Sequence, residues 1–333
     1  MLFSLCRSYL GATVNTARDT AKDLLSEYCE TEYGFGNTVF GFLKGENDYT
    51  VMLDAHIDEV GFIVTGIDKN GFLTVSNAGG IDIRMLPSRR VAVHTKSGKI
   101  PAVFCSVPPH LKSGETDFSD IENFKIDSLL GKNANDIISL GDSVTFDTQP
   151  ELLCNGLLTA KSLDDRAGVA CLIEVAKRLK DKKLPVNVAF VLSDGEELGL
   201  RGIRPAAFKV EPQEALAVDV TFGDGIGISE EECGKLGGGA MIGFAPCLDS
   251  SVSKKLCSLA EKNNIPFDRE VMGEHTGTNA DMIAISREGV KTCTVSIPLR
   301  NMHTDCEIVD IKDIENTASL ICEYILSGGV MNG

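Results

Sequence analysis

The segment YTVMLDAHIDEVGFIV (49–64) passes from an apolar stretch directly into a polar one, and the same pattern recurs along the chain. Tyr49–Leu53 predicts a short strand, and DAHIDEVG follows it at once. Further apolar stretches of strand length occur after residue 157, and they are typical of strands that are buried on both faces of a sheet. They are PVNVAFVLS (185–193), EALAVDV (214–220) and KTCTVSI (291–297).

Helical patterns alternate with these strands. In each of them apolar residues recur every three or four positions, which predicts a helix with one buried side. The predicted helices span residues 13–30, 167–180, 251–263 and 310–327. Because strands and helices alternate, we predict an α/β fold in which a mostly parallel sheet is sandwiched between helices on both faces.

The stretch between residues 62 and 155 has a different character. It contains short β-type runs such as FIVTGI, RVAVHT and DSVTFD, and turn signals such as Lys69-Asn70-Gly71 separate them. Several short strands with regular turns predict a small β-rich barrel or sandwich. We therefore expect residues 1–61 and 156–333 to form one α/β domain, interrupted by a β-rich, barrel-like domain at residues 62–155.

Composition excludes several classes of function. The 333 residues carry 32 Lys and Arg against 48 Asp and Glu, a net charge of −16, which argues against nucleic acid and against anionic membranes. No apolar run reaches the ~18 residues of a membrane span, and the first residues do not predict a signal peptide. Eleven cysteines without a CxxC pair predict reduced thiols in the cytoplasm.

Polar residues suited to metal binding follow the predicted strands. In open α/β sheets the carboxyl ends of the strands form the edge where ligands bind. An acidic pair before the helix at 167 would lie at the positive end of that helix. The residues concerned are His56 and Asp58, Glu196 and Glu197, Asp219, His303, and the pair Asp164 and Asp165.

Taken singly, each of these groups has an ordinary structural explanation, such as a hydrogen-bonded pair, a helix cap or a solvated loop. Asp219 is harder to explain in this way, because a carboxylate within the apolar run LAVDVTF needs a partner or a metal. No GxSxG or GxxxxGK[ST] motif is present. Imidazoles with carboxylates suit zinc, cobalt or manganese, and five ligands fit two ions that share one carboxylate.

The same pattern leaves one acid over for proton transfer. Of the adjacent pair Glu196 and Glu197, one can coordinate a metal while its neighbour serves as general base for a metal-bridging water. Asp58 lies two residues after His56 on the same side of an extended chain, so it can accept the proton on the outer nitrogen of that imidazole.

Six blocks of the sequence resemble the M42 family of metallo-aminopeptidases, the glutamyl, leucyl and deblocking group that builds tetrahedral particles. They occur in the family's order and cover nearly the whole chain. The blocks are LDAHIDEVGFIV (53–64), LDDRAG (163–168), EELGLRG (196–202), VDVTFGD (218–224), GTNAD (277–281) and SREGVKTCTVSIPLRNMHTDCEIVD (286–310).

The resemblance implies a zinc-peptidase-like fold and a role for each site residue. His56 and Asp219 would bind one divalent ion, Glu197 and His303 the other, and Asp164 would bridge the two. Glu196 would be the general base, and Asp58 the partner of His56. The bond between Asp164 and Asp165 is often cis in this family. Zinc is the first candidate metal, with cobalt or manganese as alternatives.

The resemblance also implies the substrate and the assembly. Peptides with a free N-terminus would be the substrates, and the β-rich domain would mediate assembly into dimers and then a dodecamer. Two alternatives remain: a related di-zinc carboxypeptidase or deacylase, with Arg201 or Arg300 holding a substrate carboxylate, and a metal-binding oligomer without catalytic activity. We also expect His94 to be structural, and His275, near GTNAD, is a candidate to approach the site.

Overall fold

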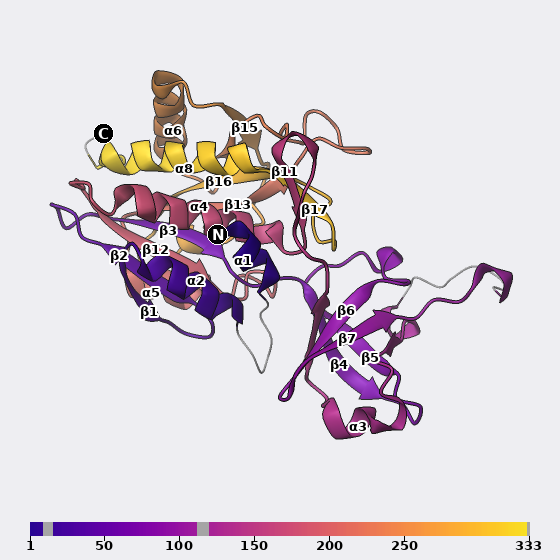
Figure 1. Cartoon of the computed structure of the whole chain (residues 1–333). Helices are drawn as coiled ribbons and strands as arrows, with labels where there is room; N and C mark the ends of the chain where they lie inside the picture. Colours follow the sequence, from indigo (N-terminus) through magenta and orange to yellow (C-terminus); the bar gives the residue numbers. More distant parts are fainter. Residues whose placement is uncertain (9–15, 112–119, 332–333) are drawn as a thin grey trace.

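The computed structural model describes residues 1–8, 16–111 and 120–331. They form an α/β body on an eleven-stranded sheet and a smaller closed β-barrel that lies between β3 (Thr50–His56) and β10 (Glu151–Leu152) in the chain. Figure 1 shows the barrel projecting to one side of the α/β body. The predicted fold class, an α/β sandwich interrupted by a barrel-like insertion, is confirmed.

The centre of the sheet is parallel and its margins are antiparallel. Four neighbouring strands run in parallel, in the order β12 (Asn187–Ser193), β3, β13 (Glu214–Phe222) and β16 (Lys291–Arg300). Antiparallel strands extend both sides of this centre. They are β1 (Glu30–Tyr33) and β2 (Val39–Leu43) on one side, and β17 (Glu307–Asp310), β11 (Leu157–Ala160) and β10 on the other. In addition, β14 (Ala240–Phe244) pairs with β16, and β15 (Phe267–Val271) pairs in parallel with β14.

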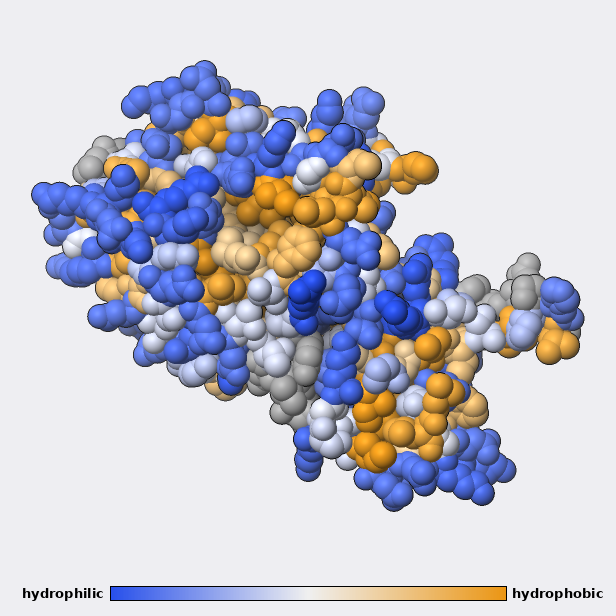
Figure 2. Space-filling model, viewed as in Figure 1, coloured by the Kyte–Doolittle hydropathy of each residue, from blue (hydrophilic) through white to orange (hydrophobic). Residues whose placement is uncertain are grey.

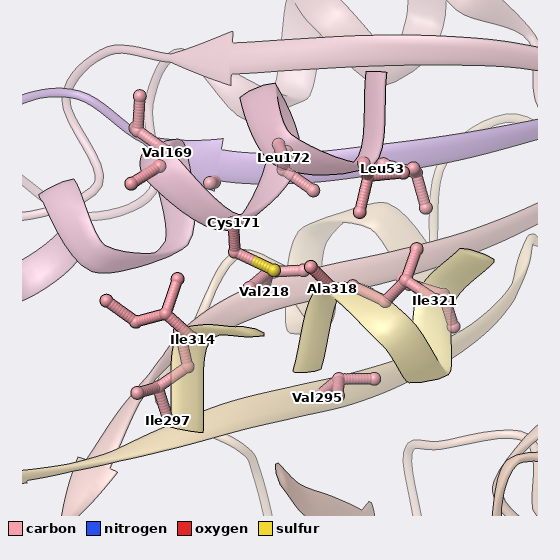
Figure 3. Close-up of a cluster of buried hydrophobic side chains, with 14 of the residues drawn as sticks. Leu53, Val169, Cys171, Leu172, Val218, Val295, Ile297, Ile314, Ala318 and Ile321 are labelled. Carbon is pink, nitrogen blue, oxygen red and sulfur yellow. The ribbon is translucent and has the colours of Figure 1, made fainter. Parts of the chain in front are cut away.

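Helices cover both faces of the sheet because the central strands are apolar on both sides. In β3, Leu53 belongs to the larger core and its neighbour Met52 to a smaller core on the opposite face. Figure 3 shows Leu53, Val218 and Val295 of the sheet within the larger core. That core includes α1 (Leu2–Arg7), α2 (Thr16–Ser26), α4 (Leu163–Leu179), α6 (Ser250–Asn263) and α8 (Ile311–Leu326), and the smaller core includes α5 (Ile203–Val210) and α7 (Ala280–Ala284).

The barrel encloses an apolar core. The Phe62 ring meets the rings of Phe104 and Phe146 edge to face, with centroids 5.1 and 5.6 Å apart. The short helix α3 (Ala134–Ile137) precedes its last strand. Around the barrel the strands follow the order β4 (Gly61–Ile67), β5 (Leu73–Ala78), β8 (Ile126–Asp127), β7 (Gly98–Phe104), β6 (Arg90–Thr95) and β9 (Ser143–Phe146).

Several predicted boundaries differ from the structure, and strand pairing explains two of the differences. The helix predicted over 13–30 is α2, which ends at Ser26, and residues 13–15 lie outside the described residues. It is shorter because Glu30 begins β1, whose pairing with β2 overrides the local helical pattern. The strand predicted over 49–53 extends to His56, since β12 pairs with it along its whole length. Within the described residues, no helix combines the length and the hydrophobicity needed to cross a bilayer.

Candidate metal centre

The predicted site residues meet at the carboxyl ends of the parallel strands. His56 ends β3, Asp219 lies within β13, and His303 follows β16 by three residues. Glu196 and Glu197 follow β12, and Asp164 stands at the start of α4. These six side chains line one cleft of about 580 Å³. Asp58 lies behind it, in contact with the imidazole of His56.

The Asp164 carboxylate lies between two imidazoles. Its Oδ1 is 2.9 Å from Nε2 of His56, and its Oδ2 is 3.1 Å from Nε2 of His303. Nε2 of His303 is also 3.3 Å from Oε1 of Glu197. Atoms able to bind a metal on Asp164, Glu197 and His303 all lie within 4.8 Å of one another. The two oxygens of one carboxylate thus face two different histidines, which is the arrangement expected of a bridging ligand.

On the other side of His56, a second group of three side chains converges. His56, Asp165 and Asp219 place potential ligand atoms within 4.8 Å of one another. Asp165 was predicted only as the neighbour of Asp164. Its Oδ2 accepts the backbone N–H of His56 at 3.2 Å, and its Oδ1 accepts the N–H of Gly168 at 2.9 Å. The Asp164–Asp165 peptide bond is cis, as the resemblance implies.

Asp58 orients two parts of the site. One of its oxygens lies 3.5 Å from Nδ1 of His56, whose other ring nitrogen faces Asp164. The same carboxylate accepts the backbone N–H groups of Glu196 and Glu197, each at 3.1 Å. Asp58 therefore fixes the position of the His56 imidazole relative to Glu196 and Glu197.

Sequence reasoning missed Glu307. This buried residue of β17 accepts the backbone N–H of His303 at 2.8 Å and that of Asp164 at 3.1 Å. It therefore ties the turn that carries His303 to the start of α4. The residue lies inside the last block that resembles the family, but no local pattern distinguished it from an ordinary strand residue.

Two glycines of the inserted domain lie beside residues of the site. Gly79 and Gly80 follow β5, and a Cβ atom would be crowded at Gly79, where it would lie 2.9 Å from Cγ1 of Val60. A Cβ atom on Gly79 would lie 3.4 Å from the carboxylate of Glu197, and one on Gly80 would lie 3.4 Å from Nδ1 of His303. Gly79 also adopts φ +88°, which favours glycine. The inserted domain thus packs directly against two predicted ligands.

Buried acids shift one another's pKa values at this site. Burial raises the pKa of Glu196 to about 7, with the neighbouring carboxylates adding to the effect and His56 opposing it. Burial likewise raises the pKa of Asp219 and of Asp165 well above the usual range. Burial would lower the pKa of His56, but hydrogen bonds to Asp164 and Asp58 raise it well above its usual value.

This donor set fits divalent cations. Asp164, Asp165, Asp219 and Glu307 are nearly inaccessible to solvent. In the described part of the chain, the basic groups that face them are the imidazoles of His56 and His303. Burying several carboxylates together is costly unless cations neutralise them. Imidazole nitrogens with carboxylate oxygens match zinc, cobalt or manganese, as expected from the sequence. The excess of buried negative charge is therefore what a pair of metal ions would balance.

The remaining predicted residues are placed as follows. His275 lines the cleft, as suggested by its position near GTNAD. His94 is buried in the barrel, with Nε2 2.8 Å from the hydroxyl of Thr145. Neither Arg201 nor Arg300 is among the described residues that line the cleft, and Arg300 forms an ion pair with Asp224.

Comparison with known proteins agrees with the resemblance found in the sequence. The family model described as M42 glutamyl aminopeptidase matches residues 36–320. The chain is 30% identical to the lysyl aminopeptidase of Pyrococcus furiosus over 91% of this chain and 89% of that one. It is also 30% identical to the glutamyl aminopeptidase of Lactococcus lactis, over 85% of this chain and 82% of that one.

A solved structure shows the same architecture. The TET1 peptidase of Pyrococcus horikoshii, which can assemble into a tetrahedron or a large octahedral shell, superposes with a TM-score of 0.84. It is 28% identical to this chain, and the match covers 93% of both chains. The likeness therefore extends over the α/β body and the barrel together.

Proposed function

The chain belongs to the M42 family of aminopeptidases, and from this premise we propose that it is a di-metal aminopeptidase with its active site in the cleft described above. In this proposal His56 and Asp219 would hold one divalent cation, Glu197 and His303 would hold the other, and Asp164 would be shared between them. The observation that carries the proposal is the Asp164 carboxylate, whose two oxygens face the Nε2 atoms of two histidines. Zinc is the first candidate, and cobalt or manganese suit the same donors.

Glu196 is the general base in this proposal. When bound, the cations supply Lewis-acid chemistry that polarises the scissile carbonyl and makes a water in the cleft easier to deprotonate. Glu196 accepts the proton of the attacking water and passes it to the leaving amine. A carboxylate beside the predicted ligands suits this role, because it can both take and return a proton. Asp58 keeps Glu196 in place through the backbone N–H that it accepts.

The charge of the cleft favours a substrate with a free N-terminus. Acidic side chains line it, and none of the described lining residues is Lys or Arg. A carboxypeptidase would need a cation for the substrate's terminal carboxylate, and Arg300 is already paired with Asp224. The acidic lining instead suits the α-ammonium group of a peptide.

Self-association is the proposed role of the barrel, taken as residues 62–155. Apolar side chains are exposed on it, and Figure 2 shows several on the face turned toward the viewer. The exposed apolar residues of the barrel include Ile63, Val103, Leu129 and Leu140. The proposed assembly is a dimer that associates further into a dodecamer, and a related structure that is 29% identical and described as a dodecamer supports the second step. We also propose a cytoplasmic location, supported by eleven cysteines that are all free thiols.

Replacing Glu196 by Gln tests the mechanism. The variant keeps the shape of the side chain but cannot accept the proton, so hydrolysis of leucyl p-nitroanilide should fall about 10³-fold. Elemental analysis should still find two ions per chain. The exposed Glu288→Gln variant, which removes the same charge at the other end of the sheet, should behave as wild type.

Different outcomes would contradict different parts of the proposed function. Retained turnover in Glu196→Gln would remove that residue from the role of base. Fewer than two ions per wild-type chain would contradict the di-metal centre. Release of residues from the C-terminal end of a peptide would favour a carboxypeptidase, and binding of metal without any peptidase activity would favour a non-catalytic oligomer.

A further inference from the structure

The cleft extends beyond the metal centre toward β15. Four residues on this side, Thr221, Phe222, Glu270 and Met272, line both the cleft and an adjoining cavity of about 660 Å³. Thr221 lies two residues beyond Asp219 on β13, a distance of about 6.5 Å along a strand. There is therefore room beside the centre for a side chain of the substrate.

The carboxylate of Glu270 is fixed at this end of the cleft. The hydroxyl of Thr221 donates a hydrogen bond to Oε1, and that of Ser296 donates one to Oε2 at 2.8 Å. Ser296 stands opposite Asp219 in the register of β13 and β16. Glu270 is thus hydrogen-bonded to β13 and β16, the two strands that border the metal centre, and lies beside the predicted ligands.

This carboxylate has no cationic partner among the described residues. The guanidinium of Arg269, its neighbour on β15, lies over the ring of Phe244, with 5.7 Å to the centroid. Asp281 is another acid of the cleft. It differs from Glu270 because the backbone N–H groups of Thr276 and Gly277 donate hydrogen bonds to its carboxylate and stabilise its negative charge. Glu270 accepts hydrogen bonds from neutral hydroxyls alone, and burial raises its pKa although both hydroxyls lower it.

We propose that Glu270 recognises the side chain of the substrate's N-terminal residue and makes the enzyme selective for lysine or arginine. The inference rests on the proposed aminopeptidase function and specifies its substrate class. The α-ammonium lies next to the scissile carbonyl and hence close to the ligand carboxylates. A lysine side chain carries its charge on a four-carbon stem, which suits a carboxylate placed farther along the cleft. Phe222 and Met272 offer apolar surface for that stem.

Matched p-nitroanilide substrates test the proposal on the metal-loaded enzyme. Norleucine has the stem of lysine without its ammonium group. Wild type should therefore hydrolyse lysyl p-nitroanilide with a kcat/KM about 10- to 100-fold above that for norleucyl p-nitroanilide, the value of a charge-assisted hydrogen bond. In Glu270→Gln this ratio should approach one, chiefly through a higher KM for the lysyl substrate. Glu270→Lys should shift the preference toward glutamyl p-nitroanilide.

The control is Glu288→Gln, which removes one negative charge far from the cleft and should keep the wild-type ratio. A lysyl-to-norleucyl ratio near one in wild type, or an unchanged ratio in Glu270→Gln, would overturn this inference alone, because hydrolysis would still be observed. Failure of the wild type to cleave any aminoacyl p-nitroanilide would overturn the proposed function, and this inference with it.

Discussion

The rim of the sheet and the interior of the barrel are both buried, but different forces stabilise them. At the rim, Asp164, Asp165, Asp219 and Glu307 lie close together with two imidazoles. In the barrel, the rings of Phe62, Phe104 and Phe146 pack edge to face, as in an ordinary apolar core. The rim should therefore depend on metal ions, whereas the barrel should fold on apolar burial alone.

The largest expected effect is that of metal removal. Ions that bind only the folded state stabilise it by about 4 kcal/mol when present at a thousand times their dissociation constant. Chelation should therefore increase hydrogen exchange at residues 54–58, 163–168 and 301–307, while β6 and β9 of the barrel keep their protection. Equal loss of protection in both regions would show that the barrel depends on the metal ions as much as the rim of the sheet does.

Asp164→Asn should reproduce this effect without a chelator. The variant loses the charge that faces both histidines, so fewer than two ions per chain should remain bound in the presence of excess metal. The exposed Asp268→Asn variant controls for the loss of one carboxylate and should bind metal as wild type does.

A smaller effect, confined to the barrel, comes from acid. Burial lowers the pKa of His94 to about 4, with Lys161 and Lys99 adding to the effect and Glu59 and Asp147 opposing it. Between pH 6.5 and 4 the unfolded chain takes up a proton that folded His94 does not. The contribution of neutral His94 to the free energy of unfolding is therefore fully present above pH 6.5. It decreases by about 1.4 kcal/mol per pH unit as the pH falls from 6.5 toward 4.

Chemical denaturation at pH 7.5 and at pH 5.5 can measure this loss. The His94→Gln variant retains an N–H group for Thr145 but does not titrate, so its advantage over wild type should grow as the pH falls. The exposed His110→Gln variant on the same domain controls for the loss of a histidine. If the stability difference between His94→Gln and wild type is the same at both pH values, His94 is not the sensor.

The two regions also differed in how far the sequence predicted them. Apolar runs followed by His, Asp or Glu were enough to place His56, Asp219 and His303 at one edge, because parallel strands bring their carboxyl ends together. Glu307 could not be found in this way, since its role depends on joining the N–H of His303, four residues away, to the N–H of Asp164 in a distant segment. The contact between the barrel and the site could not be predicted either, because it joins residues that are far apart in the sequence. Nothing local to Gly79-Gly80 indicates that they pack against Glu197 and His303.

That contact between the regions leads to the smallest expected effect. Nη1 of Arg89 in the barrel lies 3.3 Å from Oδ2 of Asp305, two residues after His303. Because Arg89 is 43% exposed, the ion pair should contribute at most about 1 kcal/mol to stability. It does fix the turn that carries His303, so Arg89→Ala should lower kcat/KM a few-fold and weaken metal binding, with the melting temperature nearly unchanged. Arg90→Ala is the matched control, since Arg90 contacts the backbone of Asp147 within the barrel and should leave activity intact. If Arg89→Ala and Arg90→Ala lower kcat/KM equally, the ion pair between Arg89 and Asp305 has no specific role in positioning His303.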